Sequence, residues 1–74
     1  MSAASDAAHI GALSSALHNL LHADPVNIAK CRIAHGKLCL ALTNACEAYG
    51  AGAGLTPGEI DTAIQGGGVP KNPA

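Results

Sequence analysis

The longest stretch of this 74-residue chain without a turn signal runs from Val26 to Tyr49 and predicts one long helix. At about 100° per residue, apolar residues fall along one side of that helix. This first stripe consists of Ile28, Cys31, His35, Leu38, Cys39, Leu42, Cys46 and Tyr49. Its steps of three and four residues are typical of an amphipathic helix, so this side is predicted to face the core.

A second, shorter apolar stripe lies roughly opposite the first, on the side that a monomer would expose. It contains Ile33 and Leu40, one heptad apart, with Gly36 between them and Lys37 beside them. A glycine inside a helix costs about 1 kcal/mol relative to alanine, which suggests that close packing requires it here. The stripe therefore predicts a partner-binding surface made of Ile33, Gly36, Lys37 and Leu40. The alternative is a set of scattered surface aliphatics, which are ordinary in monomers.

Local signals set the expected ends of this helix and of the one before it. Asp24 is a favourable N-cap and Pro25 a favourable first residue, while Gly50 is a typical stop. The prediction is a helix over about 25–49, preceded by a helix over about 5–22 and a frayed segment at 1–4. The core side of the earlier helix is Ile10, Leu13, Leu17, Leu20 and Leu21. Because the link is short, the two helices are expected to form an antiparallel hairpin.

A third, shorter helix is predicted over about 57–65, after a flexible glycine-alanine link at 50–54. Thr56 and Glu59 have the spacing of a capping box, with Pro57 at the first helical position. Leu55 and Ile60 have the spacing of a hydrophobic staple. Three glycines follow, and 66–74 is expected to be a disordered tail.

The composition predicts a weak core. Hydrophobic content is 49%, but the chain has sixteen alanines, one tyrosine and no Phe or Trp. A core in a chain of this size rarely supplies more than about 3–5 kcal/mol. We therefore expect a single all-α domain over 5–65 that assembles with copies of itself into an oligomeric helical bundle.

Several classes of protein are disfavoured by charge and hydropathy. A formal net charge of −1 with four basic residues lacks the basic patch of a nucleic-acid-binding protein. No run of apolar residues reaches the roughly 18 needed for a membrane span, and residues 1–6 lack the pattern of a signal peptide. Three cysteines, an odd number, indicate reduced thiols. A cytoplasmic protein without a membrane or nucleic-acid partner is the expectation.

Two groups of residues could carry chemistry. His18, His22, Cys31 and His35 form two pairs at i, i+4 spacing, which would make a zinc site only if all four converge. On the wheel the first two lie on a flank and the last two face the core, so no metal and no cofactor are predicted. His35 is expected to be a hydrogen-bonded core residue, with a ligand pocket as the alternative.

Catalysis is not predicted. Cys31 or Cys39 with His35 could form a nucleophile pair, but no Asp or Glu on the stripe could orient the imidazole. The glycines at 50–54 and 66–68 follow no strand and have no Gly-Lys-Ser/Thr pattern, so a phosphate loop is unsupported. We expect a protein that is not an enzyme.

One local resemblance concerns Leu40-Ala41-Leu42-Thr43 and the following Glu47-Ala48. This segment resembles the second helix of small phage proteins that sequester cyclic nucleotide signals of anti-phage immunity. Such proteins are helical hairpins that assemble into oligomers. The resemblance spans nine positions and departs after Tyr49, where a glycine-alanine run replaces an aromatic segment. No binding residue is carried over.

The functional prediction is a small, non-enzymatic, oligomeric binding protein that acts as an inhibitor, adaptor or regulator of a partner protein. Its size suggests a phage or mobile-element origin. The alternatives are a small-ligand binder, such as one that sequesters a nucleotide signal between subunits, and a metal-binding hairpin that uses His and Cys ligands.

Overall fold

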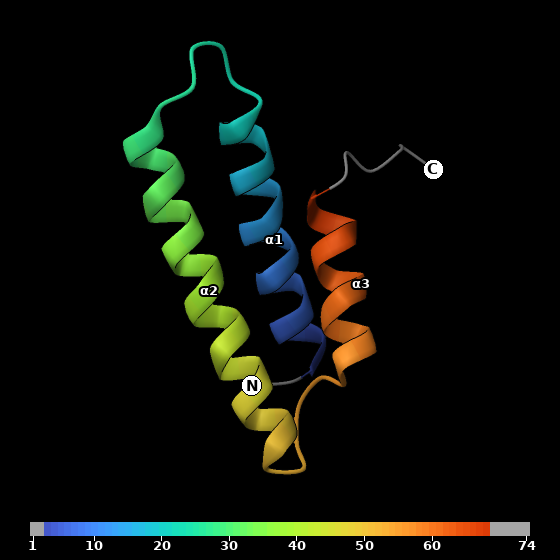
Figure 1. The fold of residues 1–74 in the computed structure, drawn as a ribbon. Helices are drawn as coiled ribbons and strands as arrows, with labels where there is room; N and C mark the ends of the chain where they lie inside the picture. Colours follow the sequence, from blue (N-terminus) through green and yellow to red (C-terminus); the bar gives the residue numbers. More distant parts are fainter. Residues whose placement is uncertain (1–2, 69–74) are drawn as a thin grey trace.

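A computed structural model describes the backbone of residues 3–68 and the side chains of residues 6–66. Three helices make up the fold (Figure 1): α1 spans Ala3–Leu21, α2 spans Ile28–Gly50 and α3 spans Pro57–Gly68. Within this described part the chain forms no strand, which confirms the predicted all-α class. The helices run up, down and up, so α1 and α2 form the antiparallel hairpin expected from their short link. Assembly into an oligomer stays a prediction.

The middle position in the fold belongs to α1 and not to the longer helix α2. Helix α1 lies between the other two, and α3 packs mainly against α1 and only lightly against α2 (Figure 1). Between residues 6 and 20, exposure is confined to a narrow strip of α1. This strip consists of Ala8, His9, Ala12, Ala16 and Asn19. Because α1 is covered on two sides, it provides most of the packing surface of the monomer.

The core takes at least one residue from every helix. Ile10 of α1 is 2% exposed and packs with Leu38 of α2, with Ile60 of α3 and with Leu55 from the loop between them. Burying an aliphatic side chain of this size contributes about 1.5–3 kcal/mol. Ser14 is also buried, and its hydroxyl donates a hydrogen bond of 2.8 Å to the Ile10 carbonyl oxygen. That bond satisfies the one buried polar side chain among the described residues.

The predicted start of α2 at Pro25 is wrong by three residues. Asn27 is the N-cap: its backbone is extended, and its side-chain oxygen accepts a hydrogen bond of 3.1 Å from the Lys30 N–H. Asparagine and aspartate cap helices about equally well, so the later cap is no weaker than Asp24 would be. Starting later also leaves residues 22–27 to bridge the gap between α1 and α2.

Helix α2 ends at Gly50, one residue later than expected, and Gly50 is not the left-handed residue that stops it. Gly52, at φ +84°, is the left-handed residue, and its N–H donates to the Tyr49 carbonyl oxygen at 2.9 Å. The Ala53 N–H donates to the Ala48 carbonyl oxygen, also at 2.9 Å. These two bonds define a Schellman motif. The glycine-alanine segment at 50–54, expected to be a flexible link, is therefore a hydrogen-bonded turn.

The capping box at the start of α3 is confirmed. The Thr56 N–H donates to a Glu59 carboxylate oxygen at 3.0 Å, and the Glu59 N–H donates to the Thr56 hydroxyl oxygen at 3.2 Å. The bonds that the Thr56 N–H and the Thr56 hydroxyl donate to this carboxylate hold the pKa of Glu59 below its usual value. The staple residues Leu55 and Ile60 are both buried in the same cluster. This end of the chain folds as its local sequence predicts.

The outer ends of α1 and α3 extend further than expected. Ala3 and Ala4 are helical rather than frayed, and α3 continues to Gly68 rather than ending at residue 65. Glycine adopts helical dihedral angles as well as left-handed ones, so the three glycines do not have to end a helix. Residues 1–2 and the remainder of the predicted tail, 69–74, lie outside the described part of the chain.

Candidate binding surface on α2

Helix α2 contacts α1 through an edge rich in alanine. Its buried residues are Cys31, Ala34 and Leu38, and Ala41 and Ala45 are packed against the core beside them. The first stripe predicted from the sequence lies to one side of this edge. The prediction that His35 is a core residue is wrong, and Cys39, Cys46 and Tyr49 are exposed as well. Small alanine side chains let two helices approach closely, and a pattern weighted towards larger apolar residues misses such an edge.

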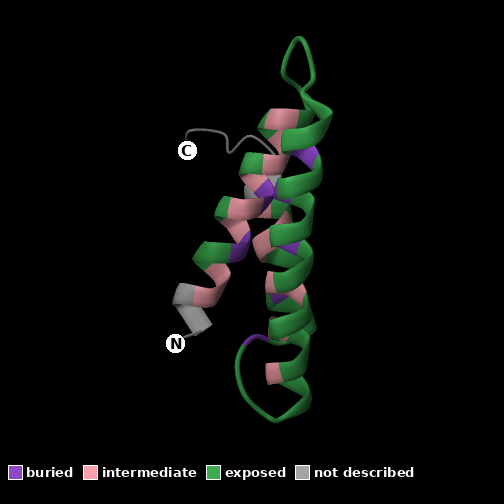
Figure 2. Cartoon of the chain, turned by 90° about the vertical axis from the view of Figure 1, so that its left-hand side faces the viewer, coloured by how far each residue is buried: buried purple, intermediate pink, exposed green. Residues whose placement is uncertain are grey.

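Because α2 contacts α1 through this alanine-rich edge, most of the surface of α2 is exposed. Figure 2 shows this for the long helix below the hairpin loop. Large apolar side chains that are exposed are concentrated there and at the hairpin loop. They are Leu21, Val26, Ile28, Ile33, Leu40 and Tyr49. Four of these six belong to α2. Among the described residues, α2 therefore carries most of the large apolar side chains that the monomer leaves exposed.

We call the predicted partner-binding residues Ile33, Gly36, Lys37 and Leu40 the outer face of α2. Ile33 is 61% exposed and Leu40 is 63% exposed, so both are available to a partner. A Cβ atom at Gly36 would meet nothing within 4 Å, apart from neighbouring backbone of the helix itself. Packing within the monomer therefore does not explain this glycine. The role of the outer face in binding stays a prediction.

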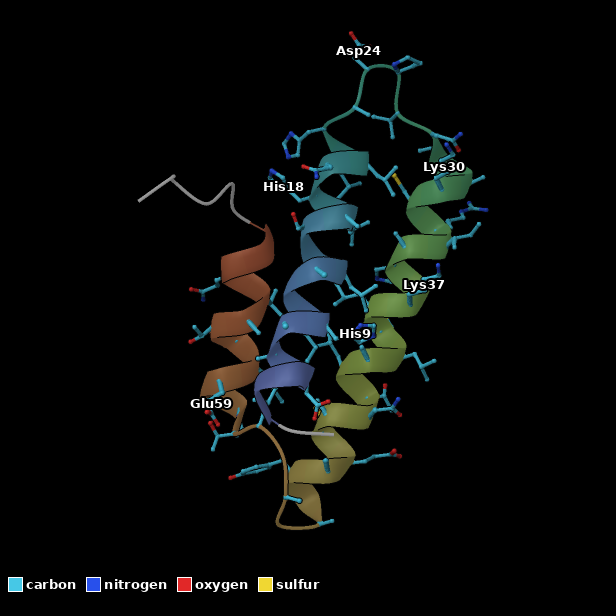
Figure 3. All side chains as sticks on the ribbon, turned by 180° about the vertical axis from the view of Figure 1, so that it is seen from behind. His9, His18, Asp24, Lys30, Lys37 and Glu59 are labelled. Carbon is cyan, nitrogen blue, oxygen red and sulfur yellow. The ribbon has the colours of Figure 1, made fainter. Side chains whose placement is uncertain are left out.

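A groove of about 300 Å³ adjoins the outer face, between α1 and the C-terminal half of α2. Figure 3 labels His9 and Lys37, which lie near the junction of these two helices. The groove is lined by Asp6, His9, Ile10, Leu13, Lys37, Leu40, Ala41, Asn44, Ala45, Ala48 and Leu55. Lys37 and Leu40 therefore belong both to the outer face and to the groove.

The groove was not predicted from the sequence. Its signal is the set of alanines at 41, 45 and 48, which recur on one side of α2 at helical spacing. Side chains this short leave space beside α1, and the walls of that space are mainly aliphatic. Asp6, His9, Lys37 and Asn44 add polar groups. The groove can therefore take an apolar group and offer hydrogen bonds around it.

The charged residues in the N-terminal half of α2 are all basic. Lys30, Arg32 and Lys37 lie in the N-terminal half of α2, and no acidic residue occurs in the sequence from 28 to 46. Three of the four basic residues of the chain are therefore grouped on this helix. The five acidic residues lie outside that segment, at positions 6, 24, 47, 59 and 61. This half of α2 favours an acidic partner.

The candidate metal ligands predicted from the sequence do not come together. The rings of His18 and His22 lie 4.4 Å apart between centroids at the end of α1, whereas Cys31 is buried and His35 is exposed on α2. Among the described residues, no group of three or more His, Cys, Asp or Glu side chains is placed to hold a metal ion.

His35 contacts Cys39, one turn further along α2. The Cys39 Sγ lies 3.5 Å from Nε2 and 3.9 Å from Nδ1 of His35, and both side chains are exposed. This is the pair weighed above as a nucleophile and its base. It lies on an open helix surface without a neighbouring carboxylate on the same stripe, so the arrangement lacks the third group of a catalytic triad.

The chain matches no protein-family model, no curated protein and no solved structure. The nine-position resemblance to the phage proteins thus gains no support from these comparisons. In the part of the chain that the structure covers, no helix combines the length with the hydropathy that a bilayer crossing requires. The exposed residues of α2 are the features from which a function can be proposed.

Proposed function

We propose that this chain is a non-enzymatic binding protein that regulates a partner protein through the outer face of α2. The observation that carries the proposal is the exposure of Ile33 and Leu40, each above 60%, on a helix whose opposite edge is packed against α1. Single exposed aliphatics are common. Two of them one heptad apart, beside an open glycine, have the spacing of anchors for a partner helix.

The partner segment has a defined chemistry under this proposal. Lys30 and Lys37 are neighbours of Ile33 and Leu40 along the same side of α2, which favours an acidic amphipathic helix. One large apolar side chain of that helix would enter the groove beside Leu40, where the walls are aliphatic. The apolar anchors favour a protein over a nucleic acid, because phosphate backbones gain nothing from aliphatic contacts.

Regulation by occupancy, as an inhibitor or adaptor, is the mode we propose. The described residues contain no arrangement that positions a nucleophile with an oriented base, whereas α2 offers a continuous surface. We place the protein in the cytoplasm, where Cys31, Cys39 and Cys46 would stay as the free thiols they are here. A partner whose acidic helix is bound to the outer face could not use that helix to bind another molecule.

To test the proposal, the 74-residue chain is immobilised and used to capture its partner from an extract of the native host. The dissociation constant of the purified partner is then measured for the chain and its variants. Leu40→Asp should weaken binding at least tenfold, because a buried Leu contributes about 1.5–3 kcal/mol and 1.4 kcal/mol is tenfold. Leu21→Asp is the matched control, since Leu21 is 54% exposed but lies at the end of α1. Equal affinities for the two variants would refute the outer face as the binding site.

A small-ligand function is the second candidate, and the groove is the observation that favours it. About 300 Å³ is at the lower limit for ligand pockets, and the mixture of aliphatic walls with Asn44 and Lys37 is typical of them. Ala45→Leu would fill the groove from α2. A nucleotide or other small molecule bound there should be lost in that variant by equilibrium dialysis and retained in Leu21→Asp.

A further inference from the structure

The His35–Cys39 pair has the separation of two ligands on one zinc ion. Zinc lies about 2.3 Å from thiolate sulfur and about 2.0–2.1 Å from imidazole nitrogen, so a tetrahedral angle places the two donors about 3.5 Å apart. The Cys39 Sγ and the His35 Nε2 are 3.5 Å apart. The i, i+4 spacing on one helix holds both donors on the same side. The two side chains are therefore already arranged as half of a site.

The surface around this pair has the pattern of a helix-to-helix contact. Steps of four and three residues alternate along it, as in the seam of a left-handed coiled coil. We call this surface the α2 seam: Ile28, Arg32, His35, Cys39, Leu42, Cys46 and Tyr49. Six of these seven residues are exposed, and Leu42 is half-buried. Within the monomer, only Leu42 of this surface packs against the core, and the other six residues are left uncovered.

A second copy of the chain is the occupant that fits this surface. In a two-fold dimer the same residues meet from both sides, so a pair near the middle of the seam meets its own symmetry mate. His35 and Cys39 are near the middle of the seam, which runs from residue 28 to 49. Two copies supply two imidazoles and two thiolates, which is the Cys₂His₂ set of structural zinc sites. Neither copy holds enough ligands alone.

From this geometry we infer that two copies of the chain bind one Zn²⁺ between their α2 seams, through His35 and Cys39 of each copy. Zinc fits better than magnesium or calcium because thiolate and imidazole are its preferred donors. Two thiolates balance the charge of the ion. Cys31 takes no part, since it is buried in the contact with α1. The seam and the outer face are different surfaces, so this inference does not depend on the proposed function.

The experiment uses full-length protein, reduced and freed of metal, with Zn²⁺ alone as the probe. Native mass spectrometry should show a shift from one chain to two chains with one zinc, reversed by a chelator. Substitution with Co²⁺ should give the visible absorption of a tetrahedral thiolate site. Cys39→Ser and His35→Gln should lose both the zinc and the two-chain mass. His18→Gln and His22→Gln should keep them, because they change histidines at the end of α1, outside the seam.

Three results would overturn the inference. The first is zinc bound at one ion per single chain. The second is zinc retained in Cys39→Ser and His35→Gln while circular dichroism shows both variants folded. The third is a two-chain species that survives the chelator and disappears only with reductant, since that would be a disulfide between exposed cysteines. If Cys39→Ser fails to fold, Cys39→Ala and the Co²⁺ spectrum of His35→Gln decide the question.

Discussion

Helices α1 and α2 use alanine in opposite ways. In α1, alanines lie at exposed positions such as Ala8, Ala12 and Ala16, while larger residues of the helix face α2 and α3. In α2, alanines lie on the buried edge, at Ala34 and Ala45, and most of the larger apolar residues other than Leu38 are exposed. Both helices are apolar in composition. Their burial differs because α1 has a helix on each side and α2 has one neighbour.

This difference separates stability from binding. Residues that stabilise the monomer pack around α1, whereas most of the large apolar residues that stay exposed lie on α2. An exposed apolar side chain contributes little to folding but retains its full transfer free energy for a partner. Substitutions in the two helices should therefore have separable effects, and the following predictions test that separation from the largest effect to the smallest.

The largest effect is expected at Ile10 of α1. Ile10→Ala should destabilise the protein by about 2–5 kcal/mol, because it removes the most buried side chain and leaves a cavity. A loss of that size would unfold most of a domain with so small a core. Chemical denaturation followed by circular dichroism measures it.

The matched substitution on α2 is Leu40→Ala. Since Leu40 is 63% exposed, the free energy of unfolding at low protein concentration should change by about 0.5 kcal/mol or less. A loss at Leu40 comparable to that at Ile10 would show that α2 is covered even in the dilute protein, and the contrast between the helices would be wrong.

The second effect concerns a glycine in each helix. A Cβ atom at Gly11 of α1 would lie 3.5 Å from the Ala63 carbonyl oxygen of α3, whereas one at Gly36 of α2 would meet no side chain or neighbouring helix. Gly11→Leu should therefore push α3 away and destabilise the protein by about 1–3 kcal/mol. Gly36→Leu should leave stability equal or higher, because leucine forms helix better than glycine. Thermal unfolding of both variants provides the comparison.

The third effect tests where α2 begins. Asn27→Ala should cost about 1 kcal/mol, because it removes the oxygen that accepts from the Lys30 N–H. Asp24→Ala is the control and should cost much less, since Asp24 lies in the loop before the helix. A larger loss of stability in Asp24→Ala than in Asn27→Ala would support the start at Pro25 that the sequence pattern predicts.

These substitutions also show how much of the fold could be predicted from the sequence alone. The start of α3 was predictable because Thr56, Glu59 and the staple act within five residues and need no other part of the fold. The start of α2 was not, because Asp24 and Asn27 cap equally well locally and the choice depends on how α2 meets α1. Tertiary packing decides between local signals of equal strength.

The same reasoning applies to the candidate site. The exposure of Ile33 and Leu40 could be predicted from periodicity. These two residues lie far from the first stripe and also from the alanine-rich edge that contacts α1. The groove and the exposure of His35 did not follow, because both depend on a shift of the contact towards Ala41 and Ala45. Hydrophobic patterns weight residues by size, whereas helix packing also selects small residues that allow close approach.

The smallest effect is a pH dependence that distinguishes the caps of α2 and α3. Bonds donated by the Thr56 N–H and hydroxyl hold the pKa of Glu59 below its ordinary value of 4.5. Because the folded pKa is the lower one, the carboxylate stabilises the folded state above pH 4.5. That contribution is lost as the pH falls through the folded pKa. The cap of α2 is an amide, Asn27, and does not titrate.

Thermal unfolding of the wild type and Glu59→Gln, from neutral pH to about pH 3, isolates this contribution from that of the other carboxylates. The wild type should be the more stable of the two at neutral pH, and the difference should shrink below pH 4.5. In an Asn27→Ala background the difference should be unchanged, because the cap of α2 and the box of α3 share no atoms. Equal stability of the two proteins at neutral pH would mean that Glu59 acts through its shape, which glutamine shares, and that its charge contributes nothing to capping α3.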